Sequence, residues 1–210
     1  MLRLHYHPTS PYSRKVSVAV AIRGDPVELR IVDVTAGEHR SPAFLALSPF
    51  GKLPVLETDH GVVFESTSEI EYLEERGPKL IPPPVAREVR HWDRVGDLYL
   101  LEPQGTMLFQ PATDAARTAE ATARTALRLL GERLGDGRRF LCGAAFTLAD
   151  LGPAIAVDHL VRMEIELAPI VAGWLDRCFD VGPMRDEREA GRPLMDRFLE
   201  RRRAALATLG

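Results

Sequence analysis

Cysteine is scarce in this chain of 210 residues, and its two cysteines, Cys142 and Cys178, lie far apart in no metal-ligand spacing. They support neither a disulfide framework nor a zinc site, so we expect no metal and a reducing compartment. An excess of positive charge is also missing, because 27 Lys and Arg stand against 30 Asp and Glu. The net charge of -3 leaves no surplus for a phosphate backbone, and we expect no nucleic-acid partner.

Long apolar runs and a basic-then-apolar N-terminal segment are missing as well. No stretch approaches the ~20 apolar residues of a membrane span, so we expect no membrane association and a cytoplasmic protein. The composition that remains, 45% hydrophobic and 27% charged, is typical of a folded chain. The length allows one large domain or two small ones.

The first 76 residues alternate between strand-like and helix-like patterns. Strand patterns cover residues 2–6, 27–34, 53–58 and 62–64, and helix patterns cover residues 11–23 and 66–76. The first strand, helix and strand predict a right-handed parallel crossover, whereas the turn at residues 59–61 predicts an antiparallel hairpin. Residues 1–76 are therefore predicted to form a small α/β domain.

The proline-rich segment 77–84 separates two halves with different sequence patterns. Proline cannot continue a helix, and we place a linker there. From residue 85 to 210 apolar residues recur at helical spacing without a strand pattern, which predicts an all-α helical bundle. Within it, Thr147 and Asp150 have the spacing of a capping box, which indicates a structural role for both.

Four short features of the first half carry polar residues at element ends, and each has a structural explanation. Ser10 before a proline fits a helix cap. Pro54 interrupts a strand, which indicates an edge, a bulge or a cis bond. Residues 65–68 join a strand to a helix, and residues 39–40 are a basic pair before a second Ser-Pro helix start. Taken singly, these signals are weak.

Taken in order, they resemble the glutathione transferase family, and the resemblance extends over the whole chain. Its most specific parts are residues 48–56 (SPFGKLPVL) and 64–75 (FESTSEIEYLEE). The resemblance implies a thioredoxin-like N-terminal domain, an all-α C-terminal helical bundle, glutathione as co-substrate and a homodimer. The serine-type tau and zeta classes look most similar, although the Ser-Ser-Cys run of the zeta class is missing. The turn before the first helix also lacks the cysteine used for thiol-disulfide exchange.

The resemblance implies roles for individual residues in holding glutathione. The backbone of Leu53, which precedes a proline that is cis in the family, would pair with the cysteinyl part. Glu65 and Ser66 match residues that hold the γ-glutamyl end, where a carboxylate and a helix N-terminus suit its ammonium and carboxylate. Arg40 and Lys52 match positions that meet the glycine carboxylate.

Two hydroxyl groups compete for the activation of the glutathione thiol. Ser10 matches the thiolate donor of serine-type members, and the dipole of the helix that follows favours negative charge there. Tyr6, at the end of the first strand, stands where tyrosine-type members keep their donor. We favour Ser10 and keep Tyr6 as second choice.

The second substrate is expected to be a small hydrophobic electrophile bound between the domains, as in detoxification. Tyr12, Tyr99 and Met107 are the candidates for its walls, although an aromatic stripe at helical spacing is also common in protein cores. Two alternatives stay open: a non-catalytic accessory protein of the same fold, and peroxidase or dehalogenase activity at the same site. The presence of both basic and acidic candidate ligands favours retained glutathione binding.

Glu69 departs from the family pattern, which usually has an aliphatic residue there. A charge at a core-facing position is costly unless it is paired. We therefore expect one of two arrangements: Glu69 reaches a basic partner, across a subunit interface for example, or the helix register is shifted by one residue and Thr67 shares the role of Ser66.

Overall fold

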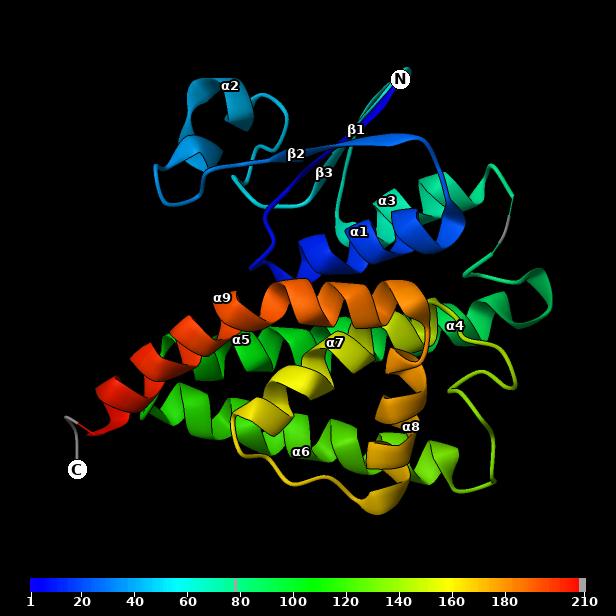
Figure 1. Ribbon diagram of the computed structural model, residues 1–210, viewed down its shortest axis with the longest axis vertical. Coiled ribbons are helices and arrows are strands. Elements are labelled where there is room, and N and C mark those ends of the chain that lie inside the picture. The colour runs from blue at the N-terminus through cyan, green and yellow to red at the C-terminus, as the bar shows by residue number, and fades with distance from the viewer. Residues whose placement is uncertain (78, 208–210) are drawn as a thin grey trace. The chain divides into compact units, whose positions relative to one another are not determined.

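The computed structural model describes residues 1–77 and 79–207, which form two compact units (Figure 1). The first unit is Met1–Ile81, and the second begins at Pro82. Their boundary falls inside the expected linker. Residues 79–81 belong to the first unit because one carboxylate oxygen of Glu74 accepts hydrogen bonds from their three amides, at 2.8, 3.0 and 2.8 Å.

The first unit is built on a four-stranded mixed sheet. Its strands are β1 (Leu2–Tyr6), β2 (Val27–Ile31), β3 (Val55–Thr58) and β4 (Gly61–Phe64), in the order β2-β1-β3-β4. β1 and β2 are parallel, whereas β3 is antiparallel to both β1 and β4. The predicted parallel crossover and the predicted hairpin are both confirmed.

Helices lie on both faces of this sheet. In Figure 1, α1 (Pro11–Arg23) and α3 (Ser66–Glu74) lie together on one side, and the segment with η1 (Glu38–Arg40) and α2 (Pro42–Leu45) lies on the other. Successive strand residues point to opposite faces, and accordingly Leu4 is buried on one face while the ring of His5 contacts Phe44 of α2 on the other. The second face is closed by a small cluster of Val32, Phe44 and Val55.

Three elements differ from the predictions by two residues or more. The second strand was expected over residues 27–34 but β2 ends at Ile31, and the helix expected over residues 66–76 ends at Glu74. The strand expected from residue 53 begins at Val55, after a cis peptide bond between Leu53 and Pro54. β2 is an edge strand, so its apolar side chains Leu29 and Ile31 stay exposed, and their pattern alone does not mark its end.

The second unit is helical, as predicted, and the described residues place one isolated β-bridge in it, Phe140 with Gly143. Its principal elements are α4 (Ala86–Gly96), α5 (Glu102–Phe109), α6 (Asp114–Leu134), α7 (Leu148–Arg162), α8 (Pro169–Phe179) and α9 (Gly182–Ala207), with short helices η2 (Pro83–Val85) and η3 (Asp97–Leu101). α7 is the central helix, because every residue from Leu148 to Leu160 is buried.

Asp150 links three parts of this helical unit. Its carboxylate accepts from the amide and the hydroxyl of Thr147, both at 3.1 Å, from the amide of Leu141 at 2.8 Å and from the indole of Trp174 at 2.9 Å. Burial raises the pKa of Asp150, whereas these hydrogen bonds lower it. The predicted structural role of the Thr147 and Asp150 pair is confirmed.

Candidate functional site

Ser10 begins α1 and serves as its N-cap. Its extended backbone (φ -81°, ψ 117°) allows its Oγ to accept a hydrogen bond from the amide of Ser13 at 3.3 Å, and Pro11 is the first helical residue. The side chain is partly exposed. In the described chain its hydroxyl accepts this bond and donates none, so the hydroxyl hydrogen is available to an acceptor outside the protein.

The turn before Ser10 is held by His7, a feature that sequence reasoning did not identify. The carbonyl of His7 accepts from the amide of Ser10 at 3.0 Å, and its Nδ1 accepts from the amide of Thr9 at 3.2 Å. Burial lowers the pKa of His7, while the charge of Asp33 opposes this effect. A neutral imidazole that accepts at Nδ1 therefore shapes the turn.

Tyr6 and Tyr12 flank this turn. Tyr6 is the last residue of β1 and Tyr12 lies in the first turn of α1, and both side chains are partly buried. Among the described residues no hydrogen bond to the Tyr6 hydroxyl is recorded. Both candidate thiol activators, Ser10 and Tyr6, therefore have a hydroxyl with donor capacity.

The strand register brings several candidate groups to one edge of the sheet. His5 pairs with Val55, and Val55 pairs with Phe64. The next residues beyond these pairs, Pro54 on one strand and Glu65 on the other, therefore follow at the same edge, beside the turn that comes after β1. The ladder begins at Val55, so the main-chain groups of Leu53 lie outside it.

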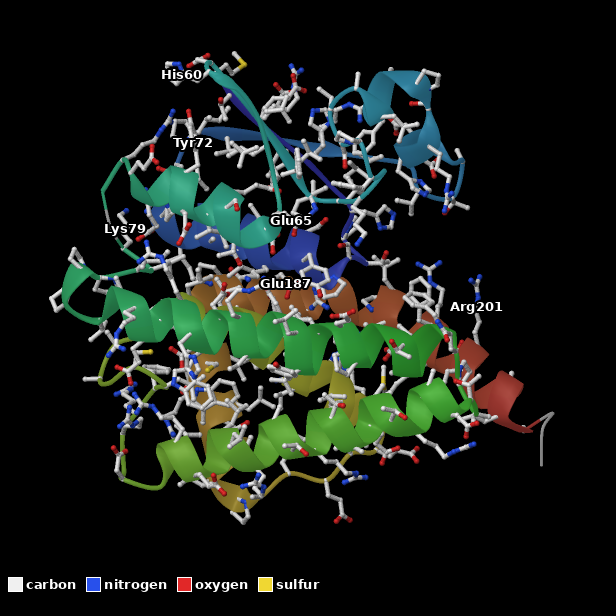
Figure 2. All side chains as sticks on the ribbon, turned by 180° about the vertical axis from the view of Figure 1, so that it is seen from behind. His60, Glu65, Tyr72, Lys79, Glu187 and Arg201 are labelled. Carbon is white, nitrogen blue, oxygen red and sulfur yellow. The ribbon has the colours of Figure 1, made fainter. Side chains whose placement is uncertain are left out.

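Glu65 and Ser66 form the junction between β4 and α3. Figure 2 shows Glu65 at the start of this helix and Tyr72 near its other end. Glu65 is exposed and has φ 79° and ψ 115°, a left-handed conformation that costs of order 1–3 kcal/mol in a non-glycine residue. Ser66 is buried at the first position of α3, where the helix amides lack partners within the helix. A strained acidic residue beside a helix N-terminus is typical of a binding site.

The backbone segments that carry Arg40 and Lys52 make a close contact with each other. A Cβ on Gly51 would lie 2.9 Å from the carbonyl oxygen of His39, so the loop before Lys52 presses against the end of η1. Arg40 is exposed, and its Nε donates to Nε2 of His39 at 3.3 Å. His39 therefore contacts both Arg40 and the loop that precedes Lys52.

The backbone of Lys52 is fixed by a buried serine. Oγ of Ser48 donates to the carbonyl of Lys52 at 2.9 Å and accepts from its amide at 3.1 Å. The side chain of Ser48 thus stands in for a strand partner just before Leu53 and the cis bond. These hydrogen bonds hold the backbone of the loop at Lys52.

Glu69 is buried on the core-facing side of α3 and reaches no basic hydrogen-bond partner within the described chain, so a partner across a subunit interface stays a prediction. Both of its carboxylate oxygens lack a hydrogen-bond partner among the described residues. The ammonium of Lys15, on α1, donates instead to the hydroxyl of Thr67 at 3.0 Å. α3 begins at Ser66, with Glu65 as its N-cap.

Comparison with known proteins agrees with this fold. Residues 4–83 match the family model described as the N-terminal domain of glutathione S-transferase. Glutathione S-transferase 3 of Zea mays is 31% identical over 170 residues, covering 73% of this chain and 76% of that protein. A glutathione S-transferase of Pseudomonas putida is 32% identical over 170 residues, covering 75% of this chain and 74% of that protein.

The chain belongs to the glutathione transferase family. A solved delta-class glutathione transferase of Nilaparvata lugens has the same fold, with a TM-score of 0.85, 24% identity and coverage of 96% of this chain and 100% of that one. The predicted family and the predicted fold class are both confirmed. The assignment to a tau- or zeta-like serine class stays a prediction.

The helical unit of this glutathione transferase carries the remaining candidates, Tyr99 and Met107. Tyr99 is 48% exposed and lies in η3, a π-helical segment in which the amide of Glu102 donates to the carbonyl of Asp97. Pro103, which lacks an amide hydrogen, follows directly, and this accounts for the widened turn. Met107 is only 2% exposed.

Clustered metal ligands and membrane-spanning helices are both absent from the described parts of this transferase. No group of three or more His, Cys, Asp or Glu side chains is arranged there to hold a metal ion. In the same residues no helix is both long enough and apolar enough to cross a membrane.

Proposed function

We propose that this transferase binds glutathione at the edge of its sheet and activates the thiol at Ser10 for attack on small hydrophobic electrophiles. The observation that carries the proposal is the Ser10 hydroxyl, which accepts from the amide of Ser13 and keeps its own hydrogen for an acceptor at the start of α1. A thiol with a pKa of ~8.5 is mostly protonated at neutral pH. A hydrogen bond to its thiolate, worth about 1.5–3 kcal/mol, lowers that pKa by one or two units.

The charges around this edge support the proposed orientation of glutathione. Arg40 and Lys52 would bind the glycine carboxylate, and the main chain of Leu53 would pair with the cysteinyl part. Glu65 would bind the γ-glutamyl ammonium, while Ser66 and the amides of α3 would bind the adjacent carboxylate. The ligand would then lie along the edge with its thiol beside the turn that carries the catalytic serine.

We further propose that Tyr12, Tyr99 and Met107 contact the electrophile. The half-exposed ring of Tyr99 offers apolar surface next to an irregular helical turn. Met107 is buried and would underlie such a site, with its flexible side chain adapting to different ligands. A detoxifying role in the cytoplasm is the biological setting that we infer.

A homodimer is the proposed assembly. Phe50 is 71% exposed, and its ring contacts that of Phe64, also exposed, edge to face at 6.1 Å between centroids. Exposed aromatic pairs of this kind are enriched in protein–protein interfaces. Sedimentation of the wild type and of Phe50→Ser tests this assembly: a wild-type dimer that becomes monomeric in the variant supports it, and a monomeric wild type contradicts it.

The proposed activity is tested by binding to immobilised glutathione and by conjugation of glutathione to a chloronitrobenzene. We expect retention on the resin and elution by free glutathione, with conjugation reduced in Ser10→Ala. The control is Thr113→Ala, which removes an equivalent helix cap from α6. Binding without turnover would favour the accessory-protein alternative, turnover of a hydroperoxide alone would favour the peroxidase, and no binding would overturn the proposal.

A further inference from the structure

Glu69 lies one helical turn after Glu65 and Ser66, the residues of the proposed γ-glutamyl site. It follows Ser66 by three residues, so these two residues share one face of the first turn of α3, and Glu65 is the N-cap directly before them. The amide of Glu69 donates to the carbonyl of Glu65 at 3.0 Å. Glu69 is therefore the next acidic group of the helix behind the exposed Glu65.

The environment of Glu69 favours its neutral form. Its side chain is 0% exposed, and in the described chain neither oxygen accepts a hydrogen bond. A buried, unpaired carboxylate is strongly disfavoured. Burial accordingly raises the pKa of Glu69 well above its ordinary value, the negative charge of Glu65 adds to this effect, and Lys15 opposes it.

Glu65 and Lys15 are the two charged residues that act on the pKa of Glu69. The other charged residues near α3 are paired, have other interactions or are exposed. On α1, Arg23 lies near the far end of α3, where it pairs with Glu74 and Asp25. Arg14 of the same helix is buried and has interactions of its own. The ionisable residue of β3, Glu57, forms pairs with His5 and Arg3, and the sequence of β4 contains no ionisable side chain. Later on α3, Glu71 makes contacts of its own, and Glu75, the C-cap of this helix, is exposed.

We propose that Glu69 is a buried proton-binding group of the γ-glutamyl site, which releases its proton to solvent when the ammonium of a γ-glutamyl ligand binds beside Glu65. The ammonium neutralises the charge of Glu65 and adds a cation nearby, so both changes favour ionised Glu69. Lys15, already buried against Thr67, supplies the remaining positive charge. Glu69 is a positioning residue, because it acts on the ligand through Glu65.

This arrangement makes the site selective for ligands with a free ammonium. A ligand without that cation would leave Glu69 protonated and would gain nothing from its ionisation. Binding also depends on pH. The affinity for a γ-glutamyl ligand rises with pH over the range in which Glu69 is still protonated in the empty site. The inference rests on the proposed function, since it assumes that the site binds the γ-glutamyl group of glutathione.

Calorimetric titration with S-methylglutathione tests the inference, because this ligand has no thiol proton. Titrations between about pH 5 and 7, below the ordinary pKa of an α-amino group, in buffers of different ionisation enthalpy count the protons released. Wild type should release up to one proton more than Glu69→Gln, and its dissociation constant should fall, relative to that of the variant, by up to about tenfold per pH unit. Protons exchanged by histidines are common to both proteins, so the difference between wild type and Glu69→Gln removes their contribution.

Glu75→Gln is the matched control, since it removes the same charge from the exposed C-cap of the same helix. It should release as many protons as wild type. If Glu69→Gln is unstable, Glu69→Met provides the same comparison with an apolar side chain of similar size. Binding with equal proton counts in wild type and the Glu69 variants would overturn this inference and leave the proposed function intact. Failure of the wild type to bind S-methylglutathione would overturn both.

Discussion

The Oγ of Ser10 accepts a hydrogen bond from the amide of Ser13 at 3.3 Å, so capping of α1 uses a lone pair of the hydroxyl and leaves its hydrogen free. Capping and thiol activation are therefore compatible in one side chain. The cap orients the hydroxyl at the helix end where the dipole stabilises negative charge.

Ser10→Ala should lose both roles, and a second cap separates them. Removal of a serine or threonine cap costs about 1 kcal/mol, so Ser10→Ala and Thr113→Ala should lose similar stability in urea unfolding. Only Ser10→Ala should also lower the conjugation rate, by about tenfold or more, because the thiolate loses a hydrogen bond from its donor. Equal rates in the two variants would assign Ser10 to capping alone.

Arg40→Ala and Lys52→Ala should weaken glutathione binding through the glycine carboxylate. A hydrogen bond to a charged group is worth about 1.5–3 kcal/mol, which corresponds to a dissociation constant about ten- to a hundredfold higher. γ-Glutamylcysteine lacks the glycine and should bind both variants almost as well as wild type. Arg76→Ala, an exposed cation over the ring of Tyr72, controls for the change in net charge. Equal losses for both ligands would contradict this assignment.

Gly51→Ala should disturb the loop that carries Lys52. Gly51 has φ 61°, and an added Cβ would lie 2.9 Å from the carbonyl of His39. Gly37 has a similar φ of 77° but open space around its Cβ, so Gly37→Ala measures the backbone cost alone, about 1–2 kcal/mol. Thermal unfolding should show a larger loss for Gly51→Ala, with weaker glutathione binding in that variant only. Equal losses of stability in the two variants would show that the loop accommodates the added methyl group without further cost.

Asp150→Ala should destabilise the helical unit. The change leaves four hydrogen-bond donors without their acceptor, and we expect a loss of about 3 kcal/mol or more in the free energy of unfolding. Asp114→Ala, which removes an exposed carboxylate that pairs with Arg117, should change stability little. Near-ultraviolet circular dichroism would follow the unfolding of this unit, because both tryptophans, Trp92 and Trp174, lie in it. A loss confined to activity would contradict the structural role of Asp150.

Glu69 should make the stability of the protein fall as the solution becomes less acidic. The pKa of this carboxyl is raised in the folded state, so between its unfolded and folded values the folded state binds the extra proton. Stability is then full below the unfolded pKa and is lost as pH rises towards the folded pKa, by about 1.4 kcal/mol per unit. Urea unfolding across this range should show the decline in wild type and not in Glu69→Gln. Parallel curves would mean that the pKa of Glu69 is not raised in the folded state, and would contradict this prediction.

The elements of the first unit could be predicted because residues close together in the sequence mark where they begin and end. Ser10 and Pro11 mark the start of α1, and Gly24, with φ 70°, ends it as a left-handed C-cap. The end of β2 was missed for the opposite reason. Val32, which directly follows β2, is buried against Phe44 and Val55, so the apolar pattern continues past the last paired residue of the strand.

The features that sequence reasoning did not reach depend on contacts between distant residues. The spacing indicated that Glu69 faces the core, but the absence of a hydrogen-bond partner among the described residues depends on where Lys15 points. The contact of Gly51 with His39 is likewise invisible in a single sequence. Pro103 signals an irregular helix, yet the irregularity spreads over the preceding π turn.

The most direct test of the central claim is the thiolate absorbance of glutathione bound at neutral pH, compared among wild type, Ser10→Ala and Tyr6→Phe. Hydrogen bonding from Ser10 predicts a thiolate signal in wild type and in Tyr6→Phe, and a signal largely lost in Ser10→Ala although glutathione still binds. Loss of the signal in Tyr6→Phe, with Ser10→Ala unchanged, would contradict the account and assign thiol activation to the tyrosine at the end of β1.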